Sequence, residues 1–347
     1  MVSNKQVIFS KVPTGYPVAG EHITIKTTEF DLDQPLNDGE FITKTLDLSV
    51  DPYFRGRMRD ASIKSYSPAF IVDEPLNGHV MLQVVRSKNN NYKEGDLLYG
   101  YGKYEEYVKY NDAFAKALRL VVRNDPKENG LPISNYVGVL GMPGMTAYVG
   151  LFKIGEIKKG ETIYISAASG AVGQLAGQIA KAHGLRVVGS ASTDDKVAYL
   201  KEIGFDGAFN YRTEDSRSKL AELCPNGIDV YFENVGGETL EIVIDLANDF
   251  ARIIACGMIS QYNTTEPYPI RNLIKVVSKR LKIQGYIVSD YAEVEPEFRE
   301  YVTKALLDGK IKYKEDITNG IEYTPEALIN VLTGKNFGKA VVHVADL

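Results

Sequence analysis

The sequence predicts an α/β protein built on a doubly wound parallel sheet, joined to a second, β-rich region. Between residues 133 and 300, short apolar runs rich in β-branched residues alternate with longer amphipathic stretches, which is typical of parallel strands covered by helices. A glycine-containing turn follows the first clear run of this kind directly. Residues 1–132 instead contain short extended segments separated by Pro, Gly and Asn, a pattern that indicates strands and turns.

Strands and helices can be assigned in order through the α/β region. The expected strands are residues 162–166, 185–188, 208–211, 228–232, 252–256 and 281–288. The helices expected between the first four strands are residues 174–183, 194–203 and 216–223, and they end at Gly184, Gly204 and Pro225. Strands and helices in this order predict a Rossmann dinucleotide-binding domain at residues 133–300.

The two ends of the chain are expected to form one discontinuous domain. The clearest N-terminal strands are residues 21–28, 40–47 and 79–85. Towards the C-terminus we expect a helix at 295–307, an extended segment at 311–313, a helix at 325–332 and a strand at 340–344. Because this mixed pattern follows the last strand of the α/β region, we expect residues 301–347 to pack with residues 1–132.

Composition narrows the class of protein. With 347 residues the chain is long enough for about two domains. A net charge of −5 argues against a nucleic-acid surface, and no apolar run is long enough to span a membrane. The only cysteines, Cys224 and Cys256, exclude a disulfide scaffold and a four-thiolate zinc site. A reducing compartment, the cytoplasm, is therefore expected.

The glycine turn after residues 162–166 predicts a pyrophosphate site. A Rossmann turn reads G-x-G-x-x-G, so that the backbone can approach the ligand at the N-terminus of the following helix. Here it reads Ala168-x-Gly170-x-x-Gly173, with alanine in the first position and Ala171 and Val172 between the glycines. The alternative is a glycine turn that serves only close packing of helix on sheet.

The next strand end favours NADP(H) over NAD(H). NAD sites place an acidic residue there for the ribose hydroxyls, whereas residues 188–193 contain none. If Thr193 caps the following helix, Lys196 lies in its first turn, where the helix dipole disfavours a cation. Such a lysine favours an anionic ligand. The alternative is a solvated lysine offset by Asp194 and Asp195, which suit a phosphate pocket only if they point away.

Six motifs occur together along nearly the whole chain. They are Leu-Ser-Val-Asp-Pro-Tyr-Phe-Arg at 48–55, Gly-Met-Pro-Gly-Met-Thr-Ala-Tyr at 141–148, the glycine turn, Glu-Asn-Val-Gly-Gly at 233–237, Cys-Gly-Met-Ile-Ser-Gln-Tyr-Asn at 256–263 and Asn-Phe-Gly-Lys at 336–339. In this combination the sequence resembles the zinc-independent medium-chain dehydrogenase/reductases. Within them it is similar to the group of leukotriene B4 12-hydroxydehydrogenase, 15-oxoprostaglandin 13-reductase and plant alkenal double-bond reductases.

This resemblance implies a GroES-like β-barrel domain for the substrate, a Rossmann domain that binds NADPH, an active site in the cleft between them, and a homodimer. It also implies roles by position. The pyrophosphate would lie on Gly170, Ala171, Val172 and Gly173, the 2′-phosphate on Lys196 and Tyr211, and the ribose near Asn234. The nicotinamide would lie against Cys256, Gly257, Ile259, Ser260, Tyr262, Tyr286, Ile287 and Val288, and Asn336 would close the site.

Catalytic zinc is the main alternative within this fold, and the sequence argues against it. Such a site needs a cysteine and a His-Glu pair in the first domain, because zinc takes thiolate and imidazole ligands. Both cysteines lie in the Rossmann half, and His79 is followed by Val80. We therefore expect no metal, and a packed or cleft-lining role for His79.

Without a metal, hydride addition to an electron-poor alkene is the expected chemistry. In an α,β-unsaturated aldehyde or ketone, hydride adds to the β-carbon and charge develops on the carbonyl oxygen, where a hydrogen-bond donor stabilises it. The resemblance indicates Tyr262 as this donor, with Tyr53 as a second candidate, although either tyrosine could be structural. The competing functions are an NADPH quinone reductase and a redox-inactive NADPH-binding protein.

Overall fold

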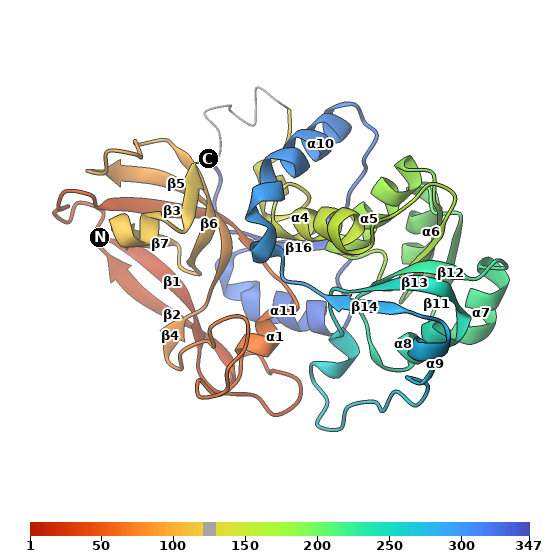
Figure 1. Ribbon diagram of the computed structural model, residues 1–347. Helices are drawn as coiled ribbons and strands as arrows, with labels where there is room; N and C mark the ends of the chain where they lie inside the picture. Colours follow the sequence, from red (N-terminus) through yellow and green to blue (C-terminus); the bar gives the residue numbers. More distant parts are fainter. Residues whose placement is uncertain (121–129) are drawn as a thin grey trace. The chain divides into compact units, whose positions relative to one another are not determined.

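The computed structural model describes residues 1–120 and 130–347, which form two units (Figure 1). Unit 1 contains Met1–Gly141 and Glu315–Leu347, and unit 2 contains Met142–Lys314. The units therefore divide after residues 141 and 314, whereas the sequence analysis placed the divisions after 132 and 300. Residues 121–129 of the predicted 1–132 segment lie outside the described residues.

Unit 2 is built on a parallel sheet of six strands in the order β11-β10-β9-β12-β13-β14. The strands are β9 (Thr162–Ile165), β10 (Arg186–Ala191), β11 (Gly207–Asn210), β12 (Ile228–Glu233), β13 (Ala247–Ala255) and β14 (Lys282–Gly285). The predicted doubly wound sheet is thus confirmed. Because the chain runs outwards from β9 in one direction and then from β12 in the other, the carboxyl ends of β9 and β12 form the switch point, where such sheets bind ligands.

Helices cover both faces of this sheet. They are α4 (Met142–Val149), α5 (Ala171–Ala182), α6 (Asp194–Glu202), α7 (Ser216–Leu223), α8 (Gly237–Leu246), α9 (Lys275–Ser278) and α10 (Glu295–Leu307), with π turn η2 (Gly150–Ile154) and 3₁₀ turns η3 (Ile259–Gln261) and η4 (Val288–Val294). Helix α4 contacts both α5 and α10, and these three helices lie above the strands in the view of Figure 1, with α8 and α9 below. Burial of β9, β10 and β12 on both faces explains the continuous apolar sequence of these central strands.

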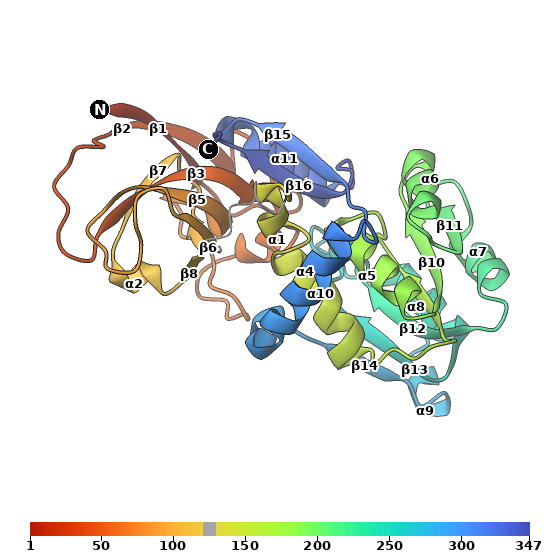
Figure 2. The ribbon, with the colours of Figure 1, turned by 90° about the horizontal axis from the view of Figure 1, so that it is seen from above.

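Unit 1 consists mainly of antiparallel strands in two sheets (Figure 2). One sheet has the order β15-β16-β3-β5-β6-β8 with β7 added beside β3, and the other has the order β2-β1-β4. The strands are β1 (Val2–Phe9), β2 (Ile23–Phe30), β3 (Phe41–Ser49), β4 (Glu74–Pro75), β5 (Asn77–Ser87), β6 (Leu97–Lys103), β7 (Tyr107–Tyr110), β8 (Leu118–Leu120), β15 (Glu315–Asn319) and β16 (Lys339–His343). Short helices are α1 (Phe54–Arg57), α2 (Asp112–Ala115), η1 (Ile133–Val137), η5 (Ile321–Tyr323) and α11 (Thr324–Leu332).

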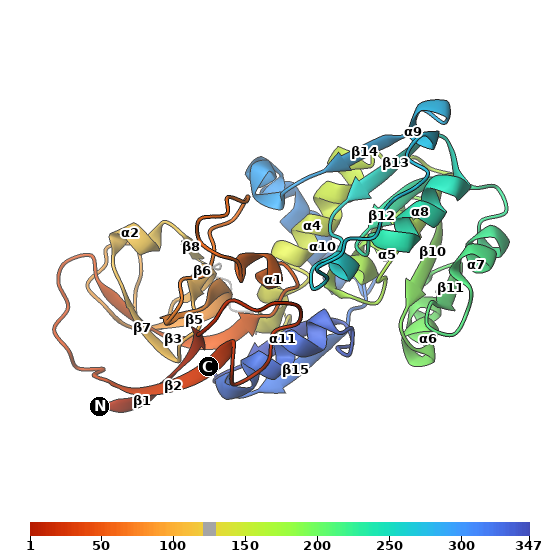
Figure 3. The same cartoon turned by 90° about the horizontal axis from the view of Figure 1, so that it is seen from below.

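The C-terminal segment belongs to unit 1, where β16 pairs with β3 and β15 pairs with β16 (blue in Figure 3). The extended segment predicted at 311–313 is not part of a sheet; the strand of this region is β15, which begins at Glu315. The backbone N–H groups of Lys312 and Lys314 donate to the side-chain oxygens of Gln178 and Gln174, at 2.8 and 2.9 Å. Two α5 glutamines therefore take the hydrogen bonds that a neighbouring strand would take.

No helix within residues 1–120 and 130–347 combines the length and the apolar character that crossing a bilayer requires.

In the β9–α5 turn, a side chain would clash with the backbone at Gly173 but not at Gly170. A Cβ at Gly173 would lie 2.7 Å from Ala168 Cα and 2.8 Å from the Ala167 oxygen, whereas a Cβ at Gly170 would meet only that oxygen, at 3.2 Å. We expect Gly173→Ala to lower the stability of the protein by about 1–3 kcal/mol, because backbone must shift. Gly170→Ala is the matched control. Equal melting temperatures of the two variants in thermal unfolding would contradict this account.

Candidate functional site

The turn between β9 and α5 is shaped to receive an anion. Ala167 adopts a left-handed backbone conformation with φ of +48°, and Gly170 begins the helix. No side chain caps this helix end, and its first turn carries no acidic residue. The positive end of the α5 dipole therefore points out of the sheet at its switch point, as a pyrophosphate site requires. Gly170, Ala171, Val172 and Gly173 form this turn together.

The carboxyl end of β10 carries a buried cation. Lys196 is only 6% exposed, and its Nζ donates to Ser192 Oγ at 3.2 Å. Thr193 caps α6, as expected, by accepting from the backbone N–H of Lys196 at 3.4 Å. The alternative of a solvated lysine is therefore wrong.

The carboxylate of Asp194 is hydrogen-bonded to another residue. Its Oδ1 accepts from Asn210 Nδ2 at 2.8 Å, which engages it with the end of β11. The next residue, Tyr211, is 45% exposed. An acid-free strand end with a buried lysine and an exposed tyrosine fits the 2′-phosphate of NADPH better than the ribose hydroxyls of NADH.

A buried carboxylate, Glu233, organises the end of β12. It has no exposed surface, and its Oε1 accepts from Tyr231 Oη at 2.8 Å and from the backbone N–H groups of Val235 and Gly236 at 2.6 and 2.8 Å. Burial raises the pKa of Glu233, and these hydrogen bonds oppose the shift. Sequence reasoning gave Glu233 no role, although an acid that ends an apolar strand just before two glycines was a usable signal.

Asn234 joins the ends of β9 and β12. Its backbone N–H donates to Ser166 Oγ at 3.0 Å, and its Nδ2 donates to the Ser166 carbonyl at 2.8 Å. The residue predicted to lie near the ribose is therefore at the switch point. Ser166, which no motif indicated, is the buried residue that holds it there.

The loop after β13 is held by the loop after β12. The backbone N–H groups of Cys256 and Gly257 both donate to the Glu233 carbonyl at 3.0 Å. One turn further on, Ser260 donates to the Val235 carbonyl from its backbone N–H at 3.0 Å and from its Oγ at 2.6 Å. Residues 256–260, predicted to face the nicotinamide, thus take their position from residues 233–235.

Tyr262 follows this loop, and its hydroxyl turns back onto it. The oxygen accepts from the Met258 backbone N–H at 3.3 Å, while the Tyr262 N–H donates to the carbonyl of Ile259 at 3.3 Å. A phenol oxygen that accepts a hydrogen bond keeps its own proton as a donor. These two hydrogen bonds hold the Tyr262 hydroxyl against the loop of residues 256–260.

Tyr286 fixes the segment after β14. Its Oη donates to the Thr146 carbonyl of α4 at 2.7 Å. A Cβ on Gly150 would lie 2.6 Å from the Tyr286 Oη, so the glycine leaves room for this hydroxyl. Burial raises the pKa of Cys256 to about 11, partly opposed by Tyr286. Ile287 and Val288 follow directly and begin η4. The predicted nicotinamide residues of unit 2 thus come from the carboxyl ends of β13 and β14.

Two predicted residues belong to unit 1. Tyr53 begins α1, with its ring edge-on to Phe54 at 5.0 Å between ring centres. Asn336 lies before β16, where its Nδ2 donates to the Gly338 carbonyl at 2.9 Å. Sequence reasoning missed Lys339, which is 1% exposed and whose Nζ lies 3.0 Å from Asp51 Oδ1. A lysine at the head of the apolar run 339–344 was the available signal.

Comparison with known proteins identifies the class. Residues 5–118 match a family model described as the N-terminal domain of oxidoreductase, and residues 171–306 match one described as zinc-binding dehydrogenase. A 2-alkenal reductase (NADP⁺-dependent) of Nicotiana tabacum is 42% identical, over 99% of this chain and 98% of its own. A zinc-type alcohol dehydrogenase-like protein of Schizosaccharomyces pombe is 46% identical over the full length of both chains.

Solved structures agree. CurA from Vibrio vulnificus in complex with NADPH is 37% identical, with a TM-score of 0.90 over 99% of this chain and 100% of its own. The fold and the site define an oxidoreductase of the medium-chain dehydrogenase/reductase class. More narrowly, the chain belongs to the zinc-independent medium-chain dehydrogenase/reductases, in the group of the alkenal double-bond reductases.

The donor atoms of this chain do not fit the zinc of the family description. Zinc needs deprotonated thiols, but burial raises the pKa of both Cys224 and Cys256 to about 11. Both lie in unit 2. Among the described residues, no three His, Cys, Asp or Glu side chains gather as a metal site would require. No catalytic step is therefore assigned to zinc.

The raised pKa of Glu233 predicts a pH-dependent stability. Its pKa in the folded protein lies above the ordinary 4.5, so its contribution is fully present below pH 4.5 and is lost as pH rises through the folded pKa. Glu233→Gln cannot ionise, and we expect its melting temperature to fall less than that of the parent over this range. The control is Glu238→Gln, an exposed residue in the first turn of α8. Parallel melting curves of parent and Glu233→Gln at every pH would contradict the assignment.

Proposed function

We propose that the protein uses NADPH to reduce the carbon–carbon double bond of α,β-unsaturated aldehydes and ketones. The observation that carries the proposal is the loop of residues 256–262 after β13, in which the Met258 N–H holds the Tyr262 hydroxyl. The tobacco 2-alkenal reductase and the (+)-pulegone reductase of Mentha piperita, 39% identical over 99% of both chains, support it.

NADPH supplies the hydride. We propose that Gly170, Ala171, Val172 and Gly173 bind its pyrophosphate, that Lys196 and Tyr211 bind its 2′-phosphate, and that Asn234 binds its ribose. The nicotinamide contacts are proposed for Cys256, Gly257, Ile259, Ser260, Tyr262, Tyr286, Ile287 and Val288, with Asn336 as a further contact. The uncapped α5 N-terminus and the buried Lys196 support the first two assignments.

Tyr262 acts on the charge that the reaction creates. Hydride at the β-carbon breaks the alkene π bond, and the electron pair moves to the carbonyl oxygen as an enolate, which then takes a proton at the α-carbon. A donor aimed at that oxygen lowers the barrier by about 2–4 kcal/mol. The Met258 N–H, by donating to the phenol oxygen, orients Tyr262 and makes its O–H a stronger donor. Tyr53 is proposed as a second catalytic tyrosine.

A product assay separates this function from its competitors. NADPH oxidation is followed with a panel of alkenals, enones and quinones, and the products are identified by mass. The proposal predicts saturated aldehydes and ketones. Hydroquinone alone would favour the quinone reductase, for which the NADPH-complexed quinone oxidoreductase of Escherichia coli, 19% identical with a TM-score of 0.74, shows the fold only. Binding of NADPH without turnover would favour a regulatory protein.

Lys196 is expected to decide between NADPH and NADH. Lys196→Ala removes the cation at the end of β10, so the KM for NADPH should rise about tenfold or more, as expected for loss of a charge-assisted hydrogen bond. The KM for NADH should stay the same. Lys201→Ala, an exposed lysine of the same helix, is the control. Equal changes in the KM values for NADPH and NADH would contradict the role of Lys196 in binding the 2′-phosphate.

Tyr262 is expected to affect turnover more than binding. Tyr262→Phe keeps the ring and removes the hydroxyl, so kcat should fall about 10²-fold or more, as for loss of one oxyanion donor, with little change in the Kd of NADPH. Tyr323→Phe, at a tyrosine 53% exposed, is the control. A loss of only a fewfold in kcat would refute a catalytic role.

We also propose a homodimer, through a surface of unit 2 made of Leu273, Ile274 and Val277, 52%, 76% and 73% exposed, beside the edge strand β14. A second copy suits this surface because an edge strand can pair with itself across a two-fold axis.

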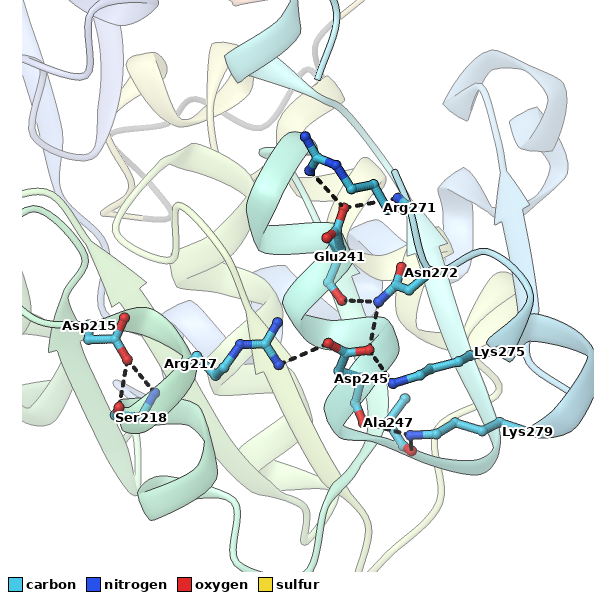
Figure 4. Close-up of polar contacts among 10 residues, drawn as sticks. All are labelled: Asp215, Arg217, Ser218, Glu241, Asp245, Ala247, Arg271, Asn272, Lys275 and Lys279. Atoms are coloured by element: carbon cyan, nitrogen blue, oxygen red, sulfur yellow. Dashed lines mark hydrogen bonds and ion pairs between the residues drawn. The ribbon is translucent and has the colours of Figure 1, made fainter. Parts of the chain in front are cut away.

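Figure 4 shows what holds the helix of this surface. Lys275 binds Asp245 Oδ1 at 2.6 Å and Lys279 binds the Ala247 carbonyl at 2.7 Å, so α9 is tied to the end of α8. Despite burial, bonds from Lys275, Asn272 and Arg217 lower the pKa of Asp245 to about 2.

Light scattering on a sizing column tests the homodimer. Val277→Asp should yield monomer, because it places a charge in the apolar surface, and Leu307→Asp, at an exposed leucine of α10, should not. A monomeric parent protein would contradict the proposal.

The location of the protein is proposed to be the cytosol, because both cysteines are free thiols.

A further inference from the structure

A buried polar cluster lies in unit 1, around the turn from Ser49 to Phe54. Asp51 is 4% exposed and accepts from Lys339 Nζ at 3.0 Å and from Ser49 Oγ. Lys339 Nζ also donates to the Val50 carbonyl at 2.7 Å. This ion pair joins β16 to the turn across 288 positions of the chain, and it leaves the charged atoms of the cluster partnered.

Arg57 and Tyr104 of this cluster are partnered as well. Arg57 is 1% exposed, and its guanidinium donates to the Asn77 carbonyl and Asn77 Oδ1, both at 2.6 Å, and to the Pro68 carbonyl at 3.0 Å. The Tyr104 hydroxyl donates to the Ser49 carbonyl. The cluster therefore follows the general rule that buried polar groups are hydrogen-bonded.

Two atoms of the cluster break this rule. The hydroxyl of Tyr53 and Nδ1 of His79 are buried and complete no hydrogen bond of good geometry within residues 1–120 and 130–347, although the Tyr53 hydroxyl lies close enough to Tyr101 to influence the pKa of that residue. A buried polar atom without a partner costs about 1–3 kcal/mol. Two such atoms in one cluster need an explanation, and a bound group that pairs with both is the simplest one.

Tyr101 links the two atoms in space. The His79 ring is edge-on to Tyr101, with centres 5.8 Å apart, and it stacks on Tyr99 at 5.7 Å. Burial raises the pKa of Tyr101, and contacts with Arg57 and the Tyr53 hydroxyl oppose this shift. Tyr53 and His79 therefore lie on the same aromatic neighbour, with the Asp51 charge acting on both.

Both groups are uncharged at neutral pH. Burial lowers the pKa of His79 to about 4, so the imidazole is neutral and carries one N–H. Burial and the nearby Asp51 raise the pKa of Tyr53, so its hydroxyl keeps its proton. The facing charges, Asp51, Lys339 and Arg57, are engaged with one another or with backbone. Two neutral donors suit an oxygen that is neutral in the substrate and gains charge during the reaction.

We propose that His79, with Tyr53, binds the carbonyl oxygen of the α,β-unsaturated substrate. This inference rests on the proposed enone reduction and adds a residue and a geometry to it. Each group donates one hydrogen bond and transfers no proton, so the enolate is stabilised where its charge collects. The Asp51–Lys339 pair acts as the positioning element, because it fixes the backbone next to Tyr53.

The test uses the full chain with methyl vinyl ketone and NADPH. His79→Leu should lower kcat/KM by about tenfold or more, the loss expected for one hydrogen bond to a charged oxygen, while the Kd of NADPH, followed by cofactor fluorescence, stays the same. His79→Gln keeps an N–H donor and should recover most of the activity. Tyr53→Phe combined with His79→Leu should lose less than the product of the two single losses, because both donors serve one oxygen. His343→Gln, at the other end of unit 1's β16, is the control.

The outcomes separate the inference from the function on which it rests. A parent protein that does not reduce methyl vinyl ketone overturns both. Reduction by the parent with unchanged kcat/KM in His79→Leu overturns the inference alone, and so does a Kd for NADPH that rises in step with the loss of activity. If His79→Leu does not fold, His79→Gln decides, since activity no better than a tenth of the parent's in a folded variant contradicts a donor role.

Discussion

Glu233 is the point on which the ligand-binding edge of unit 2 depends. Its carboxylate gathers the Tyr231 hydroxyl and two backbone N–H groups of residues 235 and 236, while its carbonyl receives Cys256 and Gly257. Through these bonds the end of β12 sets the loop after β13, and that loop sets the Tyr262 hydroxyl. A buried carboxylate is costly unless it is hydrogen-bonded, and here the bonds are made by Oε1, so removing its partners would free the loops after β12 and β13 to move.

In unit 1, a buried ion pair holds the polar turn that carries Tyr53 in position. Lys339 and Asp51 are both buried, and such a pair adds little net stability because desolvation offsets its Coulomb energy, yet losing one partner leaves an unpaired buried charge. What the pair provides is position, since it ties the last strand of the chain to the turn that carries Tyr53. Beside this turn, the Tyr53 hydroxyl and His79 Nδ1 are buried polar atoms that the proposed substrate oxygen would pair.

The sequence predicted the unit 2 sheet because strand and helix periods alternate clearly there. Helices 216–223 and 295–307 were predicted with the bounds that the structure has. The extended segment expected at 311–313 joins no sheet, because Gln174 and Gln178 pair with its backbone, a tertiary contact that no local pattern encodes. For the same reason the motif at 233–237 indicated a site without revealing that Glu233 holds it together. The binding roles of the residues remain predictions.

One measurement tests the central claim, that hydride passes to the β-carbon of a conjugated alkene. NADPH deuterated on the transferring face of nicotinamide C4 is incubated with the protein and an enal, and the label in the product is located by NMR. The account predicts a saturated aldehyde with deuterium on the β-carbon. Deuterium on the carbonyl carbon of an allylic alcohol would contradict it, because the protein would then be reducing C=O and the enolate-stabilising role of its tyrosines would have no reaction to serve.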